Sequence, residues 1–355
     1  MSQPILGTDF LSKHKINVDC SNRTIIDTNT NIKAECVNQS IPPNHLSFQV
    51  TYPDHFPKVV TSLLENYPNV IMPHQVDYTN TLNDSVVHHT IDTGSSAPVF
   101  AKARPLPPNK YDIAKREFDS MLAAGIIQPS KSEWSSPLHL VPKKDGVSWR
   151  PCGDFRRLNA ITVKDRYPIP HINSCMNRLH GKSVFSKIDL IKAYFHIPMS
   201  KADAKKTAVI TPFALFEFKS MPLGLCNAPK TYQRFMDNLF RDMPFVFVYI
   251  DDILIASTNE QEHEHHIKLV LERLNENKLH IALEKCEFFR TEVEFLGYRI
   301  TSNGLFPLKD KVDAINDYNL PSDYAALRRF LGMIGFYRRF ISNFADKAEP
   351  LYHLM

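Results

Sequence analysis

Two adjacent carboxylates, Asp251 and Asp252, interrupt an apolar stretch near the middle of the chain. The surrounding residues, 245–256, are rich in β-branched and aromatic side chains, a pattern typical of a buried strand, a tight turn and a second strand. Burying one ionised carboxylate is costly, and two side by side also repel each other. A cation is therefore expected opposite them, and a divalent metal ion is the obvious candidate. The alternative is a solvated turn whose acids face water, and the pair by itself does not exclude it.

The composition is that of an ordinary globular protein, with 355 residues of which 43% are hydrophobic and 23% are charged. The six cysteines are scattered with no Cys-x-x-Cys pair, which argues against a cysteine-based zinc site or a disulfide framework. No apolar run approaches a membrane span of ~20 residues, so we expect an intracellular protein with no membrane contact. Residues 1–100 hold five Lys and Arg against nine Asp and Glu, so the net charge of +4 hides a more basic remainder. That remainder suggests a polyanionic partner.

The order of the expected elements indicates an α+β fold with helices on one face of an antiparallel sheet. We expect a helix that begins at Asn109 or Pro108 and runs to Gly125. After a strand over Trp134–Val141, a hairpin turn is expected at Asp145-Gly146. A later strand ends at a third acid, Asp189. Further helices are expected on either side of the paired-aspartate hairpin, over Ala228–Arg241 and Glu262–Asn277.

After Gly297 the pattern becomes helical, and apolar residues recur at helical spacing from Tyr324 to Tyr337. Arg328 and Arg339 are eleven positions apart. Because each residue turns a helix by about 100°, the two arginines are expected within about 20° of each other. Such a basic face would suit a phosphate backbone, although a solvated face is an equally good interpretation.

Several short blocks resemble those of the reverse transcriptase family, specifically the long-terminal-repeat retrotransposons of the gypsy type. Tyr249-Ile250-Asp251-Asp252 resembles the family's Tyr-X-Asp-Asp box, and Lys187-Ile188-Asp189-Leu190 with Ala193-Tyr194 resembles its first carboxylate block. Three more blocks follow the family's order and spacing, at 149–159, 221–229 and 295–298. The resemblance covers residues 85–355 and implies a right-hand polymerase fold, with fingers, a palm built on an antiparallel sheet and a helical thumb.

The start of the chain resembles a different family. Ile5-Leu6-Gly7 and the residues to Leu11 resemble the last block of retroviral-type aspartic proteases. The Asp92-Thr93-Gly94 tripeptide of those proteases follows that block instead of preceding it and runs into prolines, so we do not expect it to be catalytic. Residues 88–94 instead resemble a short pairing segment upstream of retroelement polymerases. The expected domains are a C-terminal protease remnant (1–40), a linker (41–100), the fingers and palm (101–300) and a thumb-like helical segment (301–355).

The resemblance implies an RNA-directed DNA polymerase that extends a DNA primer on an RNA template with deoxynucleoside triphosphates. Physical chemistry agrees with this implication. Two divalent ions ~3.5–4 Å apart can activate the 3′ hydroxyl and neutralise the triphosphate, and Mg²⁺ prefers carboxylate oxygens. We therefore expect two Mg²⁺ ions, with Mn²⁺ as a substitute, bridged by Asp189 and Asp251. Asp252 is expected to help position them.

The other expected site residues follow from the same resemblance. Lys143 and Arg150 are expected to contact the incoming triphosphate, as a point charge and a planar fork respectively. Tyr194 is expected beneath the sugar, where it would exclude a 2′ hydroxyl, and a core tyrosine is the alternative. The remaining expected nucleotide contacts are Leu190, Ala193 and Leu223, and the expected template–primer contacts are Tyr249, Ile250, Arg328 and Arg339.

Two other functions compete with this one. An RNA-templated RNA polymerase shares the paired-aspartate palm, but Tyr194 and the flanking blocks argue against it. A catalytically inactive nucleic-acid-binding remnant of a retroelement is the alternative from another class. The helical segment is followed by no RNase H or integrase region, so we expect a Pol polyprotein fragment or a truncated gene product. We expect it in the cytoplasm within a virus-like particle, and the sequence leaves the oligomeric state open.

Overall fold

The computed structural model describes residues 16–19, 24–27, 33–35, 52–71, 87–142, 149–170 and 178–355. By its internal contacts the chain divides into two units, Met1–Thr51 and Tyr52–Met355, and each is described by itself. In the first unit an antiparallel sheet has the strand order β1 (Ile16–Asp19), β2 (Thr24–Asp27) and β3 (Lys33–Glu35). The domain boundaries expected from the sequence, including a protease remnant over 1–40, stay predictions.

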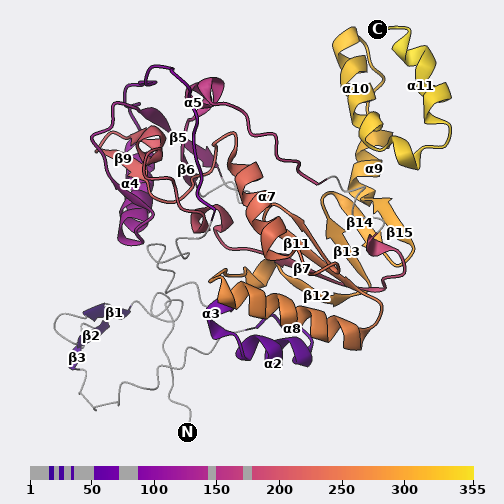
Figure 1. Ribbon diagram of the computed structural model, residues 1–355, viewed down its shortest axis with the longest axis horizontal. Coiled ribbons are helices and arrows are strands. Elements are labelled where there is room, and N and C mark those ends of the chain that lie inside the picture. The colour runs from indigo at the N-terminus through magenta and orange to yellow at the C-terminus, as the bar shows by residue number, and fades with distance from the viewer. Residues whose placement is uncertain are drawn as a thin grey trace. The chain divides into compact units, whose positions relative to one another are not determined.

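The second unit contains a four-stranded antiparallel sheet, which we call the palm sheet (Figure 1). Its strand order is β10 (Val246–Tyr249), β11 (Asp252–Ser257), β7 (Val184–Asp189) and β12 (Glu287–Arg290). β10 and β11 are the two arms of the hairpin that the sequence predicted around Asp251. Their apolar side chains are buried, which explains the continuous run of β-branched and aromatic residues.

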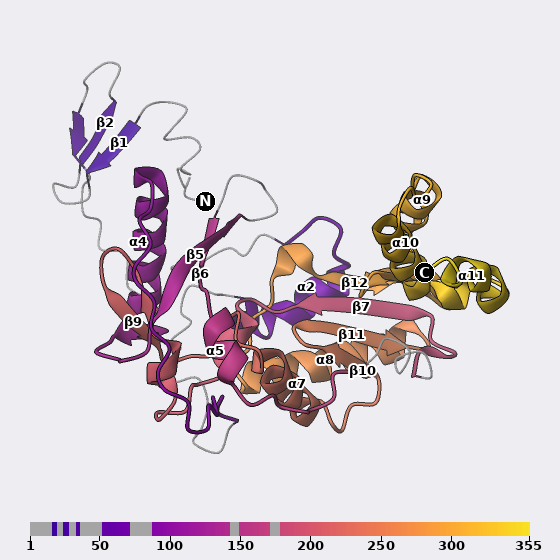
Figure 2. The same cartoon turned by 90° about the horizontal axis from the view of Figure 1, so that it is seen from above.

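Helices cover one face of the palm sheet. α8 (Glu260–Glu276) contacts β7 and β11, and α7 (Ala228–Leu239) contacts β10 (Figures 1 and 2). α8 begins two residues before the predicted start because the Asn259 side chain caps it, accepting a hydrogen bond from the Glu262 amide at 2.9 Å. On the opposite face, Phe185, Phe247 and Leu254 join a buried cluster with a small sheet formed by β13 (Glu292–Phe295), β14 (Tyr298–Thr301) and β15 (Gly304–Pro307).

A five-stranded sheet, which we call the fingers sheet, has the order β4 (Ile127–Pro129), β9 (Leu215–Phe218), β8 (Val209–Ile210), β5 (Ser136–Pro142) and β6 (Trp149–Gly153). α4 (Pro108–Ala123) packs on it, with the Phe118 ring centroid 5.2 Å from that of Phe216. α4 begins at Pro108, one of the two predicted starts, because proline suits the first helical position. β6 leads into the short helix α5 (Arg156–Ile161). The expected turn at Asp145-Gly146 lies outside the described residues.

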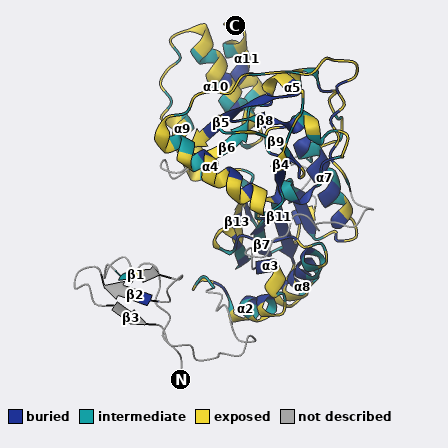
Figure 3. Ribbon diagram, turned by 90° about the vertical axis from the view of Figure 1, so that its left-hand side faces the viewer, coloured by how far each residue is buried: buried dark blue, intermediate teal, exposed yellow. Residues whose placement is uncertain are grey.

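The C-terminal part is helical, with α9 (Lys309–Asn316), α10 (Tyr324–Phe336) and α11 (Phe344–Tyr352). Tyr298 of β14 anchors these helices, because its ring centroid lies 5.5 Å from that of Phe336, 6.1 Å from Tyr337 and 5.9 Å from Phe340. Figure 3 shows much exposed surface on α9 and α10, whereas the palm strands are largely buried. Within the described part of the chain, no helix has the length and apolar character that crossing a bilayer requires.

The stretch expected to be a linker, 41–100, contains buried side chains in its described parts. α2 (Lys58–Glu65) and α3 (Pro68–Ile71) bury Val60, Leu64 and Val70 completely. Further along, the His89 amide donates to the Pro198 carbonyl at 2.9 Å. These residues therefore form part of the second unit. A helix of only four residues, such as α3, is too short for its apolar period to stand out in a sequence.

A buried polar network joins the palm sheet to α8. Ser186 of β7 and Ser257 of β11 face the helix, and the His263 ring lies between their hydroxyl groups, with Nε2 and Nδ1 each 2.7 Å from an Oγ. The Ser257 hydroxyl is also 2.8 Å from Nδ1 of His266. His263 is fully buried, and burial lowers the pKa of its imidazole to about 4, with neighbouring His266 adding to the shift.

This network predicts a specific acid sensitivity. The folded-state pKa of His263 lies below its ordinary value of 6.5, so the unfolded chain binds more protons between those two values. The free energy of unfolding should therefore fall as the pH drops from about 6.5 towards about 4, by roughly 3 kcal/mol for this group, and level off below. Urea titrations across that range should show a shallower slope for His263→Gln than for the parent. The matched control is His265→Gln at an exposed position of the same helix, and an equal flattening there would contradict the assignment.

Candidate active site

Two of the three predicted acids face each other across neighbouring strands. Asp189 at the end of β7 is the direct partner of Asp252 at the start of β11. Residues paired in this way point to the same face of an antiparallel sheet. That face is the one away from α8, because Ser186 and Ser257 lie an odd number of residues away and point towards the helix. Asp251 lies in the turn between β10 and β11, so all three acids meet at one end of the palm sheet.

Lysines from two elements offset part of this negative charge. Lys285, in the short helix η5 (Leu283–Lys285), places its Nζ 3.3 Å from Oδ1 of Asp189. Lys187 of β7 places its Nζ 3.8 Å from Oδ1 of Asp252. Asp251 is exposed and Asp252 is half-buried, and partial desolvation raises the pKa of both carboxyl groups. The charge of Asp189 raises the pKa of Asp251 further, while Lys187 opposes the rise at Asp252.

The donor set suits a divalent ion that is shared with a ligand. Among the residues that the structure describes, no group of three or more His, Cys, Asp or Glu side chains is placed to hold a metal ion unaided. Asp189 and Asp251 nevertheless line the same cavity. Mg²⁺ in nucleotide sites is commonly bound by one or two protein carboxylates, with phosphate oxygens and waters completing the shell. Two hard carboxylates beside an open cavity fit that arrangement.

The turn that carries Asp251 is strained and is held by a helix. Ile250 has a φ of 57°, a left-handed conformation that β-branched residues rarely adopt. Its amide donates to Oε1 of Gln233 on α7 at 2.8 Å. The Gln233 amide group in turn donates to the Val248 carbonyl at 3.2 Å and to Oδ1 of Asp237 at 2.8 Å. Gln233 is fully buried, so α7 fixes the turn from beneath the sheet.

A cavity of about 320 Å³ connects these acids to the fingers. Every predicted nucleotide contact that the structure describes lines it, together with Asp189 and Asp251: Arg150, Leu190, Ala193, Tyr194 and Leu223. Other lining residues were not predicted, among them Glu117, Trp149, Lys192 and Lys285. Lys143, the remaining predicted contact, lies outside the described residues. The structure thus brings residues from α4, β6 and the palm sheet to one place.

Tyr194 forms part of the cavity wall and is supported from behind. Its ring stacks on that of Tyr232 of α7, with centroids 5.3 Å apart and planes at 18°. Burial raises the pKa of the Tyr194 hydroxyl, and the charge of Asp251 adds to the shift. Tyr232 is fully buried, and its hydroxyl finds no hydrogen-bond partner among the residues that the structure describes. The two rings form a flat floor beside Asp251.

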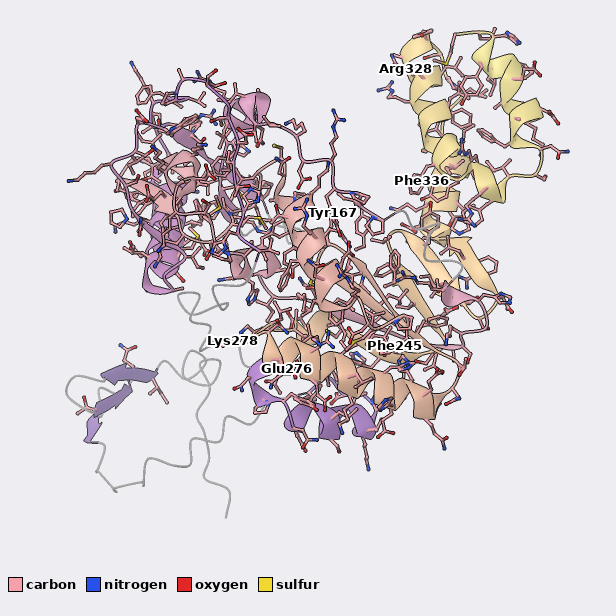
Figure 4. All side chains as sticks on the ribbon, viewed as in Figure 1. Tyr167, Phe245, Glu276, Lys278, Arg328 and Phe336 are labelled. Atoms are coloured by element: carbon pink, nitrogen blue, oxygen red, sulfur yellow. The ribbon has the colours of Figure 1, made fainter. Side chains whose placement is uncertain are left out.

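The predicted template–primer residues are not brought together. Tyr249 and Ile250 are half-buried at the hairpin, and Tyr249 packs against the core cluster behind it. Arg328 is exposed on α10 (Figure 4). The expectation that Arg339 shares its helical face is wrong, because α10 ends at Phe336 and Arg339 lies in the separate short helix η6 (Arg338–Phe340). The helical-wheel argument does not extend across that break.

Sequence reasoning missed two residues of this site, Gln233 and Lys285. Gln233 is a polar residue within the apolar stripe of α7, and a buried amide at such a position signals a hydrogen-bonding role. Lys285 lies in the short segment between α8 and β12, outside the family blocks at 149–159, 221–229 and 295–298. No local pattern indicates its contact with Asp189, which is 96 positions away.

Known sequences resemble this chain over most of its length. Residues 141–300 match the family model described as reverse transcriptase (RNA-dependent DNA polymerase). The chain is 36% identical to the retrovirus-related Pol polyprotein from transposon opus of Drosophila melanogaster, over 99% of this chain and 35% of that polyprotein. It is 34% identical to the Pol polyprotein from transposon gypsy of the same fly, over 77% of this chain and 27% of that one. The chain therefore spans only about a quarter to a third of the length of these curated relatives.

Solved structures give the same answer for the fold. The foamy viral protease–reverse transcriptase in complex with double-stranded DNA superposes with a TM-score of 0.74 at 26% identity, covering 83% of this chain and 51% of that one. The same viral protein in complex with an RNA/DNA hybrid gives a TM-score of 0.70 at 25% identity, covering 83% of this chain and 39% of that one. The α+β polymerase fold expected from the sequence is thus confirmed.

Because Gln233 is fully buried, removing its hydrogen bonds should lower the free energy of unfolding. Gln233→Met keeps the side-chain volume but leaves the Ile250 amide and the Val248 carbonyl without their partner. The free energy of unfolding should drop by about 1–3 kcal/mol. The matched control is Gln128→Met, which removes an exposed hydrogen bond to Glu217 and should cost less than ~0.5 kcal/mol. Urea denaturation measures both, and equal losses would show that the buried amide does not hold the turn.

Proposed function

Because the chain belongs to the reverse transcriptase family of gypsy-type long-terminal-repeat retrotransposons, we propose that it is an RNA-directed DNA polymerase. It would add deoxynucleotides to a DNA primer on an RNA template. The cavity shared by Asp189, Asp251, Arg150 and Tyr194 supports this activity most directly. It places acids able to bind metal, a cation able to bind phosphate and an aromatic floor around one space. The volume of that space, about 320 Å³, lies in the range of small-molecule sites.

Asp189 and Asp251 are proposed to hold two Mg²⁺ ions, or Mn²⁺ in their place. When bound, the ions would activate the primer hydroxyl and neutralise charge on the triphosphate. Asp252 has a different position, because it pairs with Asp189 across the strands and lies 3.8 Å from Lys187. That ion pair suits a positioning role. Lys285 holds Asp189 at 3.3 Å and thereby limits the repulsion among the acids.

The fingers side of the cavity is proposed to bind the triphosphate. The Arg150 guanidinium on β6 offers a planar fork of donors that matches phosphate oxygens. Lys192 also lines the cavity and adds positive charge from the palm side. Lys143 remains a predicted contact by its place in the sequence alone.

Nucleic acid is the proposed polymeric partner. The foamy viral relatives were solved in complex with double-stranded DNA and with an RNA/DNA hybrid. An RNA template and a DNA primer would therefore suit this chain. Arg328 is exposed on α10 and could contact a phosphate backbone without help from Arg339.

Replacing the metal-binding acids should abolish extension. Asp189→Asn or Asp251→Asn keeps the side-chain volume but substitutes a much poorer ligand for a hard divalent cation. Primer extension on an RNA template should fall by on the order of 10³ or more, equivalent to ~4 kcal/mol of barrier. Asp252→Asn should do less harm if that acid only positions the others.

The control for this series is Asp242→Asn, an acid whose ion pair with Arg273 lies outside the cavity. It should extend primers at the parental rate. The series is measured as single-turnover extension across Mg²⁺ concentrations. A near-parental rate for Asp189→Asn would show that the proposed metal site is wrong.

The stacked tyrosines predict how the enzyme selects its sugar. If the Tyr194 ring lies beneath the incoming deoxyribose, Tyr194→Val should admit ribonucleotides at least about tenfold more readily and leave deoxynucleotide addition largely intact. Tyr194→Phe keeps the ring that stacks on Tyr232 and should discriminate as the parent does. The measurement is the ratio of kcat/KM for the two nucleotides. Unchanged discrimination in Tyr194→Val would make Tyr194 a packing residue.

A further inference from the structure

The residues just before the polymerase region pack against α8 and β12, the neighbours of the strand that carries Asp189. Residues 52–71, which contain α2 and α3, lie against α8 (Figure 1). Phe56 packs edge-on against Phe288 of β12 with ring centroids 5.1 Å apart. The Tyr67 hydroxyl donates to Oε1 of Glu272 at 3.0 Å. With Val60, Leu64 and Val70 fully buried, this contact is an apolar interface.

The interface continues into a chain of hydrogen bonds that ends at Asp189. The Ile281 amide donates to the Val70 carbonyl at 2.9 Å, and Nδ1 of His280 lies 2.7 Å from the Asn69 carbonyl. A carbonyl only accepts, so Nδ1 carries the hydrogen and donates. On its other edge the same segment, residues 280–282, bonds the end of β7. The Ala282 amide donates to the Asp189 carbonyl at 2.9 Å, and the Ile191 amide donates to the His280 carbonyl at 2.8 Å.

Segment 280–282 therefore lies between α3 and the residues that carry the metal-binding acid. Its last residue leads straight into η5, where the Lys285 amide donates to the Ala282 carbonyl at 2.9 Å and the Lys285 side chain reaches Asp189. A shift of the segment would move both Asp189 and its lysine. If α2 and α3 only shielded apolar surface, their side-chain contacts would be enough. The hydrogen bonds from His280 and Ile281 to the carbonyls of Asn69 and Val70 would not be needed.

We propose that residues 52–71 are a positioning element of the polymerase site, fixing Asp189 and Lys285 through segment 280–282. These residues lie outside the matched family region, 141–300. The expected change in primer extension rests on the proposed function. The expected change in amide exchange rests on the geometry alone. It extends the functional unit towards the N-terminus as far as Tyr52.

The test changes the link at His280 in the full chain. His280→Phe keeps an aromatic ring beside His196 but removes the donor to Asn69, whereas His280→Asn retains a donor. Val70→Asp places a charge at a fully buried position and should undock α3. The control is Ser62→Ala at an exposed position of α2. Two quantities are measured, the amide exchange rates of Ile191 and Ala282 and the Mg²⁺ concentration that gives half-maximal primer extension.

We expect His280→Phe to accelerate exchange at Ile191 and Ala282 by about tenfold, the effect of losing one hydrogen bond. The half-maximal Mg²⁺ concentration should rise several-fold, while His280→Asn and Ser62→Ala stay within about twofold of the parent. If Val70→Asp does not fold, the comparison of His280→Phe with His280→Asn still tests the positioning role. Faster exchange with an unchanged Mg²⁺ requirement would overturn the proposal, since α2 and α3 would then be only a cover.

Unchanged amide exchange at Ile191 and Ala282 in His280→Phe would overturn the proposal as well. If the parent extends no primer, the proposed function fails instead. The positioning role is then decided by exchange together with the rise in thermal midpoint on adding Mg²⁺. That rise should be smaller in His280→Phe than in His280→Asn, and an equal rise would reject the role.

Discussion

The crowding of negative charge at one end of the palm sheet is the constraint on which the rest of the structure depends. Asp189, Asp251 and Asp252 meet there, and partial desolvation raises the pKa of the last two. Lys285 and Lys187 oppose the repulsion from two different elements. Acids that are not fully compensated in this way are what the proposed divalent-cation site requires. The repulsion among these acids destabilises the fold, and the buried apolar side chains on both sides of the sheet offset that cost.

Helix α7 holds two parts of the proposed active site in place. Gln233 holds the strained Ile250 turn, while its neighbour Tyr232 supports the Tyr194 ring from behind. The turn that carries Asp251 and the floor of the proposed sugar site are thus fixed by consecutive residues of one helix. A rotation of α7 would disturb both together. This explains why α7 buries a glutamine and a tyrosine hydroxyl among its mostly apolar side chains.

The sequence predicted the parts of the site that depend on local order. The apolar run around Asp251 and Asp252 has the period of a buried hairpin, and the family blocks carry Arg150, Tyr194 and Leu223 into one cavity. Contacts between distant segments were not predictable in this way, since no period in the chain relates Lys285 to Asp189 or Val70 to Ile281. The shared face of Arg328 and Arg339 failed for a related reason. Apolar spacing does not report where a helix ends, and α10 stops before the second arginine.

The pairing of Asp189 with Asp252 limits which changes of length the chain can accept. Side chains on a strand alternate between faces, so one residue added within β7 or β11 would turn its acid towards α8. The same slip would move Ser186 or Ser257 away from His263 and leave a buried imidazole between apolar neighbours. Codon deletions and insertions in these twelve residues should therefore be far rarer among functional copies than substitutions. The long connections from β7 to β10 and from β11 to β12 are free of that constraint, whereas the two-residue turn that carries Asp251 is not.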